Sequence, residues 1–444
     1  MTHCSTQLDF PFFKDARLTA TPDGGSIVSD AGLLLVREFD EKIGFTHAIS
    51  DVIYDPRDPR FVVHPQIDLL RQRIYQIVAG YEDCNDATRL RHDPIFKAVA
   101  GRTPEDVPLG SQPTLSRLEN RVGLDTQMEA VDVLVRRFIA TRPEPLQEIT
   151  LDIDPSEAET YGQQELTFFN AHYDSYMYFP QFICDAKTRF LLAAVLRPGN
   201  VGTVQGAILL LDRIVRLLRH AWPDLKIRVR GDSNFADPAL LNWLEEQQIP
   251  YTIGMGGNKA LAALSAPFVK TVEERFRASG QPQRSFTSIR YRTQKTWARK
   301  RRIVVKVEVT SLGTNVRYVI ATHPGRSRDL YEWYVERGGT IEDALEQLKN
   351  GFQGDRLSCR DFKANAFRLI VHAAAYNLIL LFREHVAVPE LADADIQTVR
   401  VKLIKVGALI VRTARRLWVK LSSTWPFLDL FKKVHAVLVP APSG

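Results

Sequence analysis

The sequence predicts a mixed α/β fold, in which a helix-flanked mixed sheet follows a helical N-terminal block and carries a β-rich insertion. Apolar residues recur every three to four positions as far as about Gln147, a spacing typical of amphipathic helices. A period of two begins at Ile149, and predicted strands then alternate with helices. From Asn258 that alternation stops, and two apolar strands, 303–309 and 316–321, follow.

The first predicted domain, residues 1–146, is a helical block. Its periodicity predicts helices over 31–39, 65–79 and 128–139. The segment Pro113–Asn120 is expected to be a capped helix, with Thr114 at the N-cap and with Arg117 and Arg121 on one exposed face. Such a helix could enter a DNA groove or be an ordinary amphipathic helix of a bundle, and the sequence favours neither.

Residues 147–257 form the first part of the predicted core, after a proline-punctuated linker. Strands are expected over 149–153, 176–184, 190–196, 225–229 and 251–255, and helices over 203–219 and 238–247. A right-handed crossover would return the strand before Asp232 parallel to the strand before Asp154. Both carboxylates would then emerge at the rim where such sheets bind ligands. Asp152 lies on the same strand face as Asp154.

Three further segments complete the predicted organisation. Residues 258–325 are the β-rich insertion, and 326–385 are the second part of the core, helical with a break at Gly338-Gly339. Residues 386–444 form a basic C-terminal segment.

Positive charge is concentrated in two runs. The chain has 58 Lys and Arg against 52 Asp and Glu, a net charge of +6. No acidic residue interrupts 285–306 or 396–428, and each run contains several Lys and Arg with interleaved aromatics. Two such runs favour a polyanion partner over simply solvated faces.

Cysteine spacing and hydropathy indicate the compartment. Cys4, Cys84, Cys184 and Cys359 are scattered without a C-x-x-C pair, so we expect reduced thiols and neither a disulfide framework nor a zinc site. No signal peptide is evident, and no apolar run approaches the ~18–20 residues of a membrane span. A cytoplasmic location is therefore expected.

The segment from Tyr334 to Lys349 places polar residues on successive helical turns. Gly338-Gly339 ends one predicted helix, and Thr340 with Asp343 resembles a capping box that starts the next. Glu342, Glu346 and Lys349 then stack on one face. Taken alone, this could be a surface charge ladder, in which each i,i+4 pair contributes only ~0.3–0.5 kcal/mol.

The chain resembles the DDE transposases of bacterial insertion sequences that carry a Y-R-E-K signature and a β-strand insertion before the glutamate. Tyr334 and Arg337 match the signature, and six residues separate Glu342 from Lys349 as expected. The Arg-to-Glu gap is four rather than three, so Glu346 is the alternative glutamate. Further matches are Gly80–Asp86, Thr114–Asn120, Leu151–Ser156, Arg197–Asn200, Arg230–Phe235 and Ala375–Leu378.

The resemblance implies an RNase H-like core whose three carboxylates are Asp154, Asp232 and Glu342. They would hold two Mg²⁺ (or Mn²⁺) ions, which stabilise the entering and leaving oxygens of an in-line displacement at phosphorus. Asp154 is preferred over Asp152 because Asp154-Pro-Ser156 fits the family's Asp-x-Ser/Thr step at a strand end. Asp237 is interpreted as a helix N-cap.

The resemblance also implies DNA contacts. Tyr334, Arg337 and Lys349 would grip phosphates near the cut, Arg as a fork and Lys as a point charge. Trp297 would stack on an unpaired base or be a core tryptophan, and the core alternative is slightly favoured. We also expect DNA contacts from Arg299, Arg301 and Arg302 in the insertion and from Arg117 and Arg121 in the N-terminal block.

The expected partner is double-stranded DNA, both terminal inverted repeats and target, bound by a homodimer that brings two ends together; no membrane is involved. The implied activity is metal-dependent cleavage and strand transfer in cut-and-paste transposition, at the bacterial nucleoid. Two alternatives are an RNase H-like nuclease that does not join strands and a non-catalytic, transposase-derived DNA-binding protein.

Overall fold

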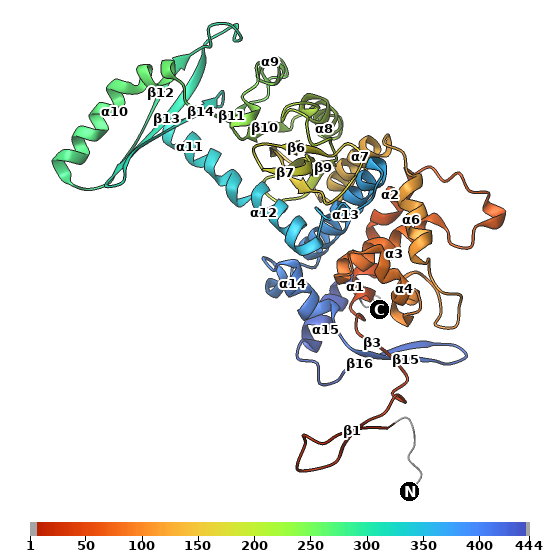
Figure 1. Cartoon of the computed structure of the whole chain (residues 1–444). Helices are drawn as coiled ribbons and strands as arrows, with labels where there is room; N and C mark the ends of the chain where they lie inside the picture. The colour runs from red at the N-terminus through yellow and green to blue at the C-terminus, as the bar shows by residue number, and fades with distance from the viewer. Residues whose placement is uncertain (1–6, 441–444) are drawn as a thin grey trace. The chain divides into compact units, whose positions relative to one another are not determined.

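The computed structural model describes residues 7–440, and these form two compact units (Figure 1). Among the described residues, the first unit comprises 7–50, 55–118 and 378–440, and the second comprises 51–54 and 119–377. The N-terminal block therefore shares a unit with the C-terminal segment, and its last part, from Glu119, belongs with the core. Predicted domain boundaries at 146 and 386 do not coincide with this division.

The first unit is mainly helical, with short strands. Its elements are β1 (Leu8–Phe10), β2 (Leu18–Ala20), β3 (Ser26–Val28), α1 (Leu33–Ile43), α2 (Phe45–Asp51), α3 (Gln66–Ala79), α4 (Ala87–Leu90), α5 (Pro94–Val99), α6 (Gln112–Arg121), α14 (Ile396–Val399), β15 (Ala408–Arg412), β16 (Leu417–Leu421) and α15 (Leu428–Leu438). Strand β15 pairs with both β16 and β3, so the C-terminal segment is folded into this unit.

Part of the C-terminal basic run is structural. The Arg400 guanidinium is buried and donates hydrogen bonds of 2.8 Å to the carbonyl oxygens of Ile77 and Val78, at the end of α3. The last carbonyls of a helix lack the usual i+4 donor, and the Ile77 carbonyl also accepts from the Gly80 amide at 3.0 Å. Burial lowers the pKa of Arg400 to about 10. Arg400 therefore completes the end of α3 and does not belong to a solvent-facing surface that could bind a polyanion.

The second unit is built on an eight-stranded mixed sheet. Its strand order is β12-β13-β14-β11-β10-β4-β8-β9. Strands β4, β10 and β11 run parallel, whereas β8 and β9 form an antiparallel hairpin beside β4. The bounds are β4 (Glu148–Pro155), β8 (Gln181–Asp185), β9 (Leu191–Val195), β10 (Lys226–Gly231) and β11 (Tyr251–Met255). The predicted order of strands and helices in the core is confirmed.

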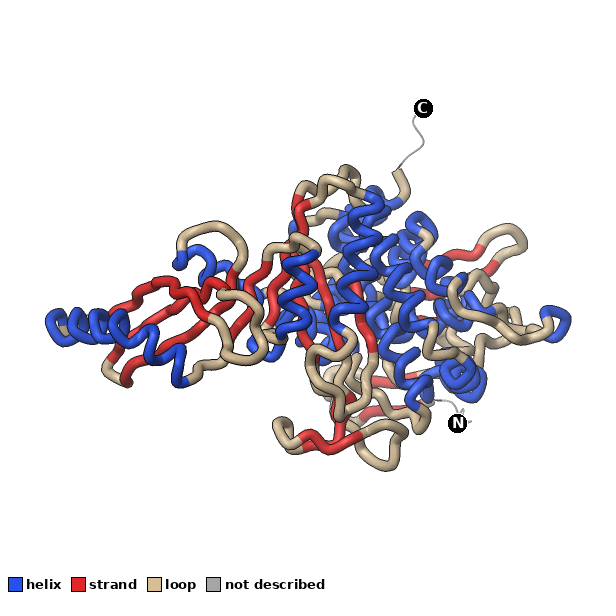
Figure 2. The backbone as a smooth tube through the Cα atoms, turned by 90° about the horizontal axis from the view of Figure 1, so that it is seen from above, coloured by secondary structure: helices blue, strands red, loops and turns tan. Residues whose placement is uncertain are grey.

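Helices lie on both sides of this sheet (Figure 2). Helix α7 (Thr126–Ala140) packs against β9 and α8 (Ala207–Ala221), and α9 (Pro238–Glu246) follows β10. After the insertion come α11 (Ser327–Val335), the 3-10 turn η4 (Glu336–Gly339), α12 (Ile341–Glu346), the π-helical segment η5 (Gln347–Gly351) and α13 (Phe362–Val386).

One predicted strand is interrupted. The segment predicted as 176–184 divides into β7 (Ser175–Tyr178), which joins β5 (Ala158–Glu159) and β6 (Phe168–Asn170) in a small sheet, and β8 of the main sheet. Pro180 lies at the break, and proline cannot donate the backbone hydrogen bond that a continuous strand needs.

The insertion begins with a helix that the periodicity did not predict. Helix α10 (Lys259–Ser279) contains Pro267, and it precedes β12 (Gln283–Tyr291), β13 (Arg301–Thr310) and β14 (Gly313–Ala321). Strand β14 pairs with β11, so the insertion extends the main sheet. Alternate residues of β13 and β14 face α10 and α11; Val304 and Val319 pack beneath Leu330 of α11.

Helix α13 corrects one expectation. It is long and apolar enough to cross a membrane by length and composition, although no such segment was predicted. Its apolar 18-residue window is 94% buried within the protein, which is typical of a core helix. Cys84, Cys184 and Cys359 are not joined in a disulfide, and Cys4 lies outside the described residues.

Candidate active site

Two aspartates lie at one edge of the sheet, at the carboxyl ends of neighbouring parallel strands. Strands β4 and β10 pair as far as Ile153 and Gly231, and Asp154 and Asp232 are the next residues. The Asp232 carboxylate accepts hydrogen bonds of 2.9 Å from the backbone and side-chain amides of Asn234, which fix its turn. The structure thus brings together two acids from distant parts of the sequence, as the strand pattern predicted.

Arg337 connects Asp154 to the predicted glutamate. Its Nη1 donates to Asp154 Oδ2 at 2.7 Å, and its Nη2 donates to Glu342 Oε1 at 3.1 Å. Glu342 lies in the first turn of α12 and is 57% exposed. Glu346 lies one turn further along the same helix and is exposed. The geometry therefore favours Glu342 over Glu346 as the third acid.

Asp154 lies in an unfavourable place for a negative charge. Burial raises the pKa of this carboxyl to about 7; Arg337 opposes the rise, and the charges of Asp232 and Glu342 add to it. A carboxylate in this position needs added positive charge to remain ionised at neutral pH.

Asp152 has a different environment, two residues earlier on β4. It is fully buried, and Arg230 grips both of its oxygens, with Nε to Oδ1 at 2.7 Å and Nη2 to Oδ2 at 2.8 Å. The Thr340 hydroxyl also donates to Asp152 Oδ2. Because these contacts use the carboxylate, Asp152 is better explained as a structural residue than as a metal ligand.

The Asp152–Arg230 pair also joins the sheet to the segment that carries Glu342. Arg230 Nη1 donates to the Trp333 carbonyl oxygen at 2.6 Å, and its guanidinium lies 5.2 Å from the centre of the Trp333 ring. No pattern in the sequence assigns this role to Arg230. The position of Arg230 between apolar residues of β10 is the only sequence pattern that marks it. Its role depends on the parallel β4–β10 register, which places it beside Asp152.

The capping-box prediction for Thr340 is wrong. Thr340 precedes α12, but its side chain makes no cap hydrogen bond to that helix. The hydroxyl is instead directed at Asp152. Asp343, the other half of the predicted box, lies 3.5 Å from Arg189.

Tyr334 and Lys349 flank the acids on either side. The Tyr334 hydroxyl lies so close to β11 that a Cβ on Gly254 would be 2.5 Å from its oxygen, which explains the glycine. Burial raises the pKa of Tyr334, so the phenol stays protonated. Lys349 Nζ lies 2.6 Å from Glu157 Oε1, and both side chains are partly exposed. Their predicted phosphate contacts remain predictions.

The insertion residues divide into buried and exposed groups. Trp297 is 6% exposed and packs edge-on against Tyr291, which supports the core alternative over base stacking. Arg301 is also buried: it pairs with Glu245 at 2.7 Å and lies over the Trp297 ring. Its predicted DNA contact is therefore corrected, because the guanidinium does not face solvent.

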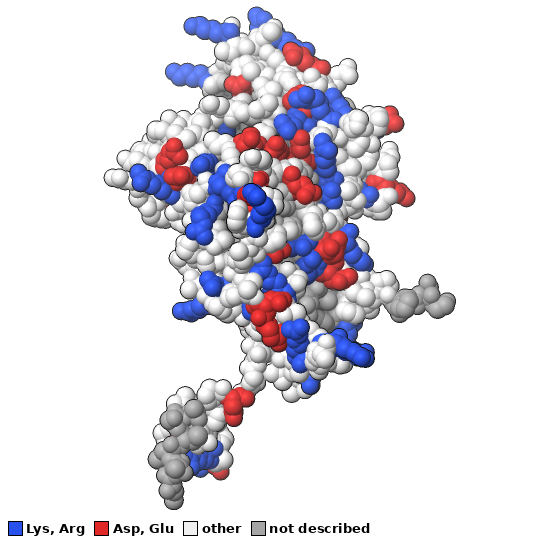
Figure 3. All heavy atoms as spheres, turned by 90° about the vertical axis from the view of Figure 1, so that its right-hand side faces the viewer, with Lys and Arg blue, Asp and Glu red and all other residues white. Residues whose placement is uncertain are grey.

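Other predicted basic contacts stay on the surface. Arg299 is 58% exposed and pairs with Glu245 at 2.5 Å, and Arg302 is half-buried. On the face drawn in Figure 3, Lys and Arg side chains alternate with Asp and Glu, so the charge excess is not gathered there.

The predicted groove-binding helix begins earlier than expected. Helix α6 starts at Gln112, and the Ser111 hydroxyl lies 3.0 Å from that of Thr114, which is already within the first turn. The prediction of Thr114 as N-cap is wrong. Arg117 is exposed and Arg121 is half-buried, so only Arg117 is fully presented to a partner.

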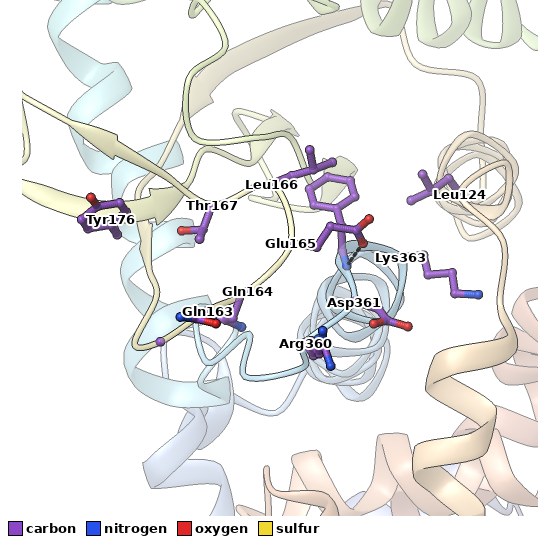
Figure 4. Close-up of a pocket in the computed structure, with 12 residues that line it drawn as sticks. Leu124, Gln163, Gln164, Glu165, Leu166, Thr167, Tyr176, Arg360, Asp361 and Lys363 are labelled. Carbon is purple, nitrogen blue, oxygen red and sulfur yellow. Dashed lines mark hydrogen bonds between the residues drawn. The ribbon is translucent and has the colours of Figure 1, made fainter.

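A cavity of about 840 Å³ lies elsewhere in the second unit (Figure 4). The loop 162–167, Tyr176 and the start of α13 line it, and none of the three acids does. The Glu165 carboxylate accepts the Phe362 amide at 2.9 Å and so caps α13. This cavity is therefore separate from the three carboxylates of the predicted site.

The acids offer suitable donors for a hard divalent cation. Within residues 7–440, no three His, Cys, Asp or Glu side chains are grouped closely enough to hold a metal ion. The Arg337 guanidinium instead lies against Asp154 and Glu342. The donors are all carboxylate oxygens, the set that Mg²⁺ or Mn²⁺ prefers, and the elevated pKa of Asp154 shows that this position needs positive charge.

The comparison with family models agrees with the sequence resemblance. A family model described as transposase DDE domain group 1 matches residues 10–443. No curated protein sequence matches the chain. Among solved structures, a cryo-electron microscopy structure of a piggyBac transposase synaptic complex with hairpin DNA is similar over 85% of this chain and 80% of that chain, with 13% identity and a TM-score of 0.43.

Proposed function

The chain belongs to the family of transposase DDE domains, group 1, and from this membership we propose that it moves an insertion sequence by cutting and rejoining DNA. Asp154, Asp232 and Glu342 are the proposed catalytic carboxylates. The observation that carries this proposal is the bridge from Asp154 through Arg337 to Glu342, beside Asp232. Acids at the ends of neighbouring parallel strands support the RNase H-like core expected of the family.

We propose two Mg²⁺ or Mn²⁺ ions, held by the three carboxylates. When bound, they stabilise the entering and leaving oxygens of the displacement at phosphorus. Their charge would satisfy Asp154 and Glu342, so Arg337 would no longer be needed between them. Its planar fork would then be free to bind a phosphate near the cut.

Tyr334 and Lys349 would complete the grip on the DNA backbone. The protonated Tyr334 hydroxyl can donate a hydrogen bond to a phosphate oxygen, and it lies beside the turn that carries Asp232. Lys349 would exchange Glu157 for a phosphate at little cost, since a partly exposed ion pair contributes only ~0–1 kcal/mol.

The proposed partners are terminal inverted repeats and target DNA, at the nucleoid in the bacterial cytoplasm. Because both ends of an element must be joined to one target, we propose that a homodimer forms the synaptic complex.

A joining assay with paired element ends tests the reaction class. Purified protein, Mg²⁺ and two labelled terminal repeats should yield strands covalently joined to target DNA. Cleaved but unjoined ends would instead assign a nuclease, and binding without cleavage would assign a DNA-binding protein. Either of those results would contradict the proposed function.

Recognition of the ends needs a separate test, because contacts with phosphate carry no sequence information. We propose that Arg117 on α6 contacts a base edge. The full-length chain should be used, since α7 packs within the second unit and a fragment of residues 1–146 would lose that packing. Arg117→Ala should lower the preference for terminal-repeat over random DNA more than it lowers total affinity. An unchanged preference would move sequence recognition elsewhere.

A further inference from the structure

A second cavity, of about 520 Å³, is lined by cationic side chains at one end of the insertion's strands. It lies where the end of β12 and the start of β13 meet two further segments. These are residues 248–250, which precede β11, and residues 321–324, at the end of β14. Its charged lining residues are Glu245, Arg290, Arg299, Lys300, Arg301 and Arg302. Five cations thus surround one carboxylate.

The single carboxylate is already fully engaged. Glu245 accepts hydrogen bonds from Arg301 at 2.7 and 3.2 Å and from the Tyr251 hydroxyl at 2.7 Å, and it pairs with Arg299 at 2.5 Å. Hydrogen bonds of this kind outweigh the effect of burial and lower the pKa of Glu245. Glu245 is therefore shared by Arg299 and Arg301 and offsets one positive charge, so an excess of positive charge stays in the cavity and Arg290, Lys300 and Arg302 have no part in that network.

The remaining cations lie next to one another. Arg290 and Arg302 are direct cross-strand partners in the antiparallel β12–β13 pair, so their side chains share one face. Arg302 donates to the neutral Ser327 hydroxyl at 3.3 Å. Within residues 7–440, no carboxylate pairs with Arg290, Lys300 or Arg302. Like charges directly opposite each other destabilise a sheet, and a bound anion would relieve that repulsion.

We propose that Arg290, Lys300 and Arg302 form a binding site for phosphates of the DNA backbone. This proposal rests on the proposed function for the identity of the polyanion. Two guanidinium forks and one ammonium match the oxygens of adjacent phosphates. The site lies apart from the catalytic carboxylates and would hold a second stretch of the same DNA, independently of base sequence.

The salt dependence of DNA binding tests the site directly. Full-length Arg290→Ala and Arg302→Ala should each reduce the slope of log affinity against log salt, for an unrelated duplex, by about 0.9 per lost phosphate contact. Arg277→Ala is the matched control, because it removes the same charge from the insertion, on a residue that already pairs with Glu273. Equal slopes for all three variants would overturn the proposal.

Thermal stability without DNA gives a second readout. Removing either arginine of the cross-strand pair should raise the Tm of the free protein, and Arg277→Ala should not. The unrelated duplex should raise the Tm of the wild type more than that of Arg290→Ala. Stabilisation by pyrophosphate but not by duplex would assign a free phosphate ligand and reject the DNA site.

These outcomes are distinguishable from failure of the proposed function. Loss of salt slope in Arg290→Ala, with no strand joining by the wild type, would support the phosphate site and reject transposition. Normal strand joining by the wild type, with an unchanged salt slope in Arg290→Ala, would support transposition and reject the phosphate site.

Discussion

Two arginine–aspartate contacts lie two residues apart on β4 and differ in how completely each carboxylate is satisfied. Arg230 holds both oxygens of Asp152 in a fully buried pair, and Thr340 and Trp333 complete the network. Arg337 donates only to Oδ2 of Asp154, and its other terminal nitrogen donates to the exposed Glu342. The first contact is closed and structural. The second leaves acceptor capacity and unrelieved repulsion, which is what a cation-binding site requires.

The largest expected effect is on catalysis. Asp154→Ala and Asp232→Ala should each reduce Mg²⁺-dependent cleavage to background, because each removes a proposed ligand, while DNA binding persists. Asp237→Ala is the matched control: Asp237 caps α9 through the amides of Ala239 and Leu240, and its loss should cost only ~1 kcal/mol of stability. Substantial cleavage by Asp232→Ala would reject the assignment.

Next in size is the effect on stability of opening the closed pair. Asp152→Ala leaves Arg230 buried without its partner and should lower the free energy of unfolding by about 3–5 kcal/mol. Chemical denaturation measures this. Asp154→Ala should not lower it, since the ionised Asp154 is itself unfavourable. If Asp152→Ala proved as stable as the wild type, the closed pair would not be structural.

The pH dependence of stability should distinguish the two aspartates further. The folded-state pKa of Asp154, about 7, exceeds its ordinary value of 3.8. In metal-free protein the folded state therefore keeps a proton that the unfolded state releases between about pH 4 and pH 7. Stability should fall across that window, by at most about 1.4 kcal/mol per pH unit, and level off above it.

Asp154→Asn should remove this fall, because asparagine is neutral throughout. Denaturation midpoints in a chelator, measured at several pH values, provide the test. If the stability of the wild type and of Asp154→Asn changed with pH in the same way, Asp154 would be ionised in the folded protein without a bound metal ion.

The smallest expected effect is that of changing the alternative glutamate. Glu346→Ala should leave cleavage near the wild-type rate. Glu342→Ala should instead reduce cleavage to background, as the two aspartate variants do, because Glu342 is the acid that Arg337 joins to Asp154. Single-turnover cleavage of both variants decides between them. The opposite ranking would mean that the extra residue before Glu342 shifts the register by one turn.

Strand ends were the most predictable part of the site. Apolar alternation located β4, β10 and β11, and the handedness of the crossover was enough to place Asp154 and Asp232 on one rim. The family resemblance supplied Glu342 and Arg337, whose position on a later helix no local pattern fixes.

Other features depend on pairing between distant segments, which local patterns do not encode. Arg301 stands within a basic run, yet its partner Glu245 comes from α9, and that contact decides its burial. Arg230 needs the β4–β10 register in the same way. Helix α10 was not predicted, and it contains Pro267; a proline inside a helix removes a backbone hydrogen bond, so packing must compensate.

Because β14 pairs with β11, the insertion covers an edge of the core sheet and so helps to keep the protein soluble. An insertion that formed a separate domain could be deleted and the ends rejoined. Here deletion would turn β11 into an edge strand, with the backbone groups that now pair with β14 facing water. Such an edge is a template for pairing with other chains. Shortened versions of this protein should therefore aggregate before they reveal what the insertion does.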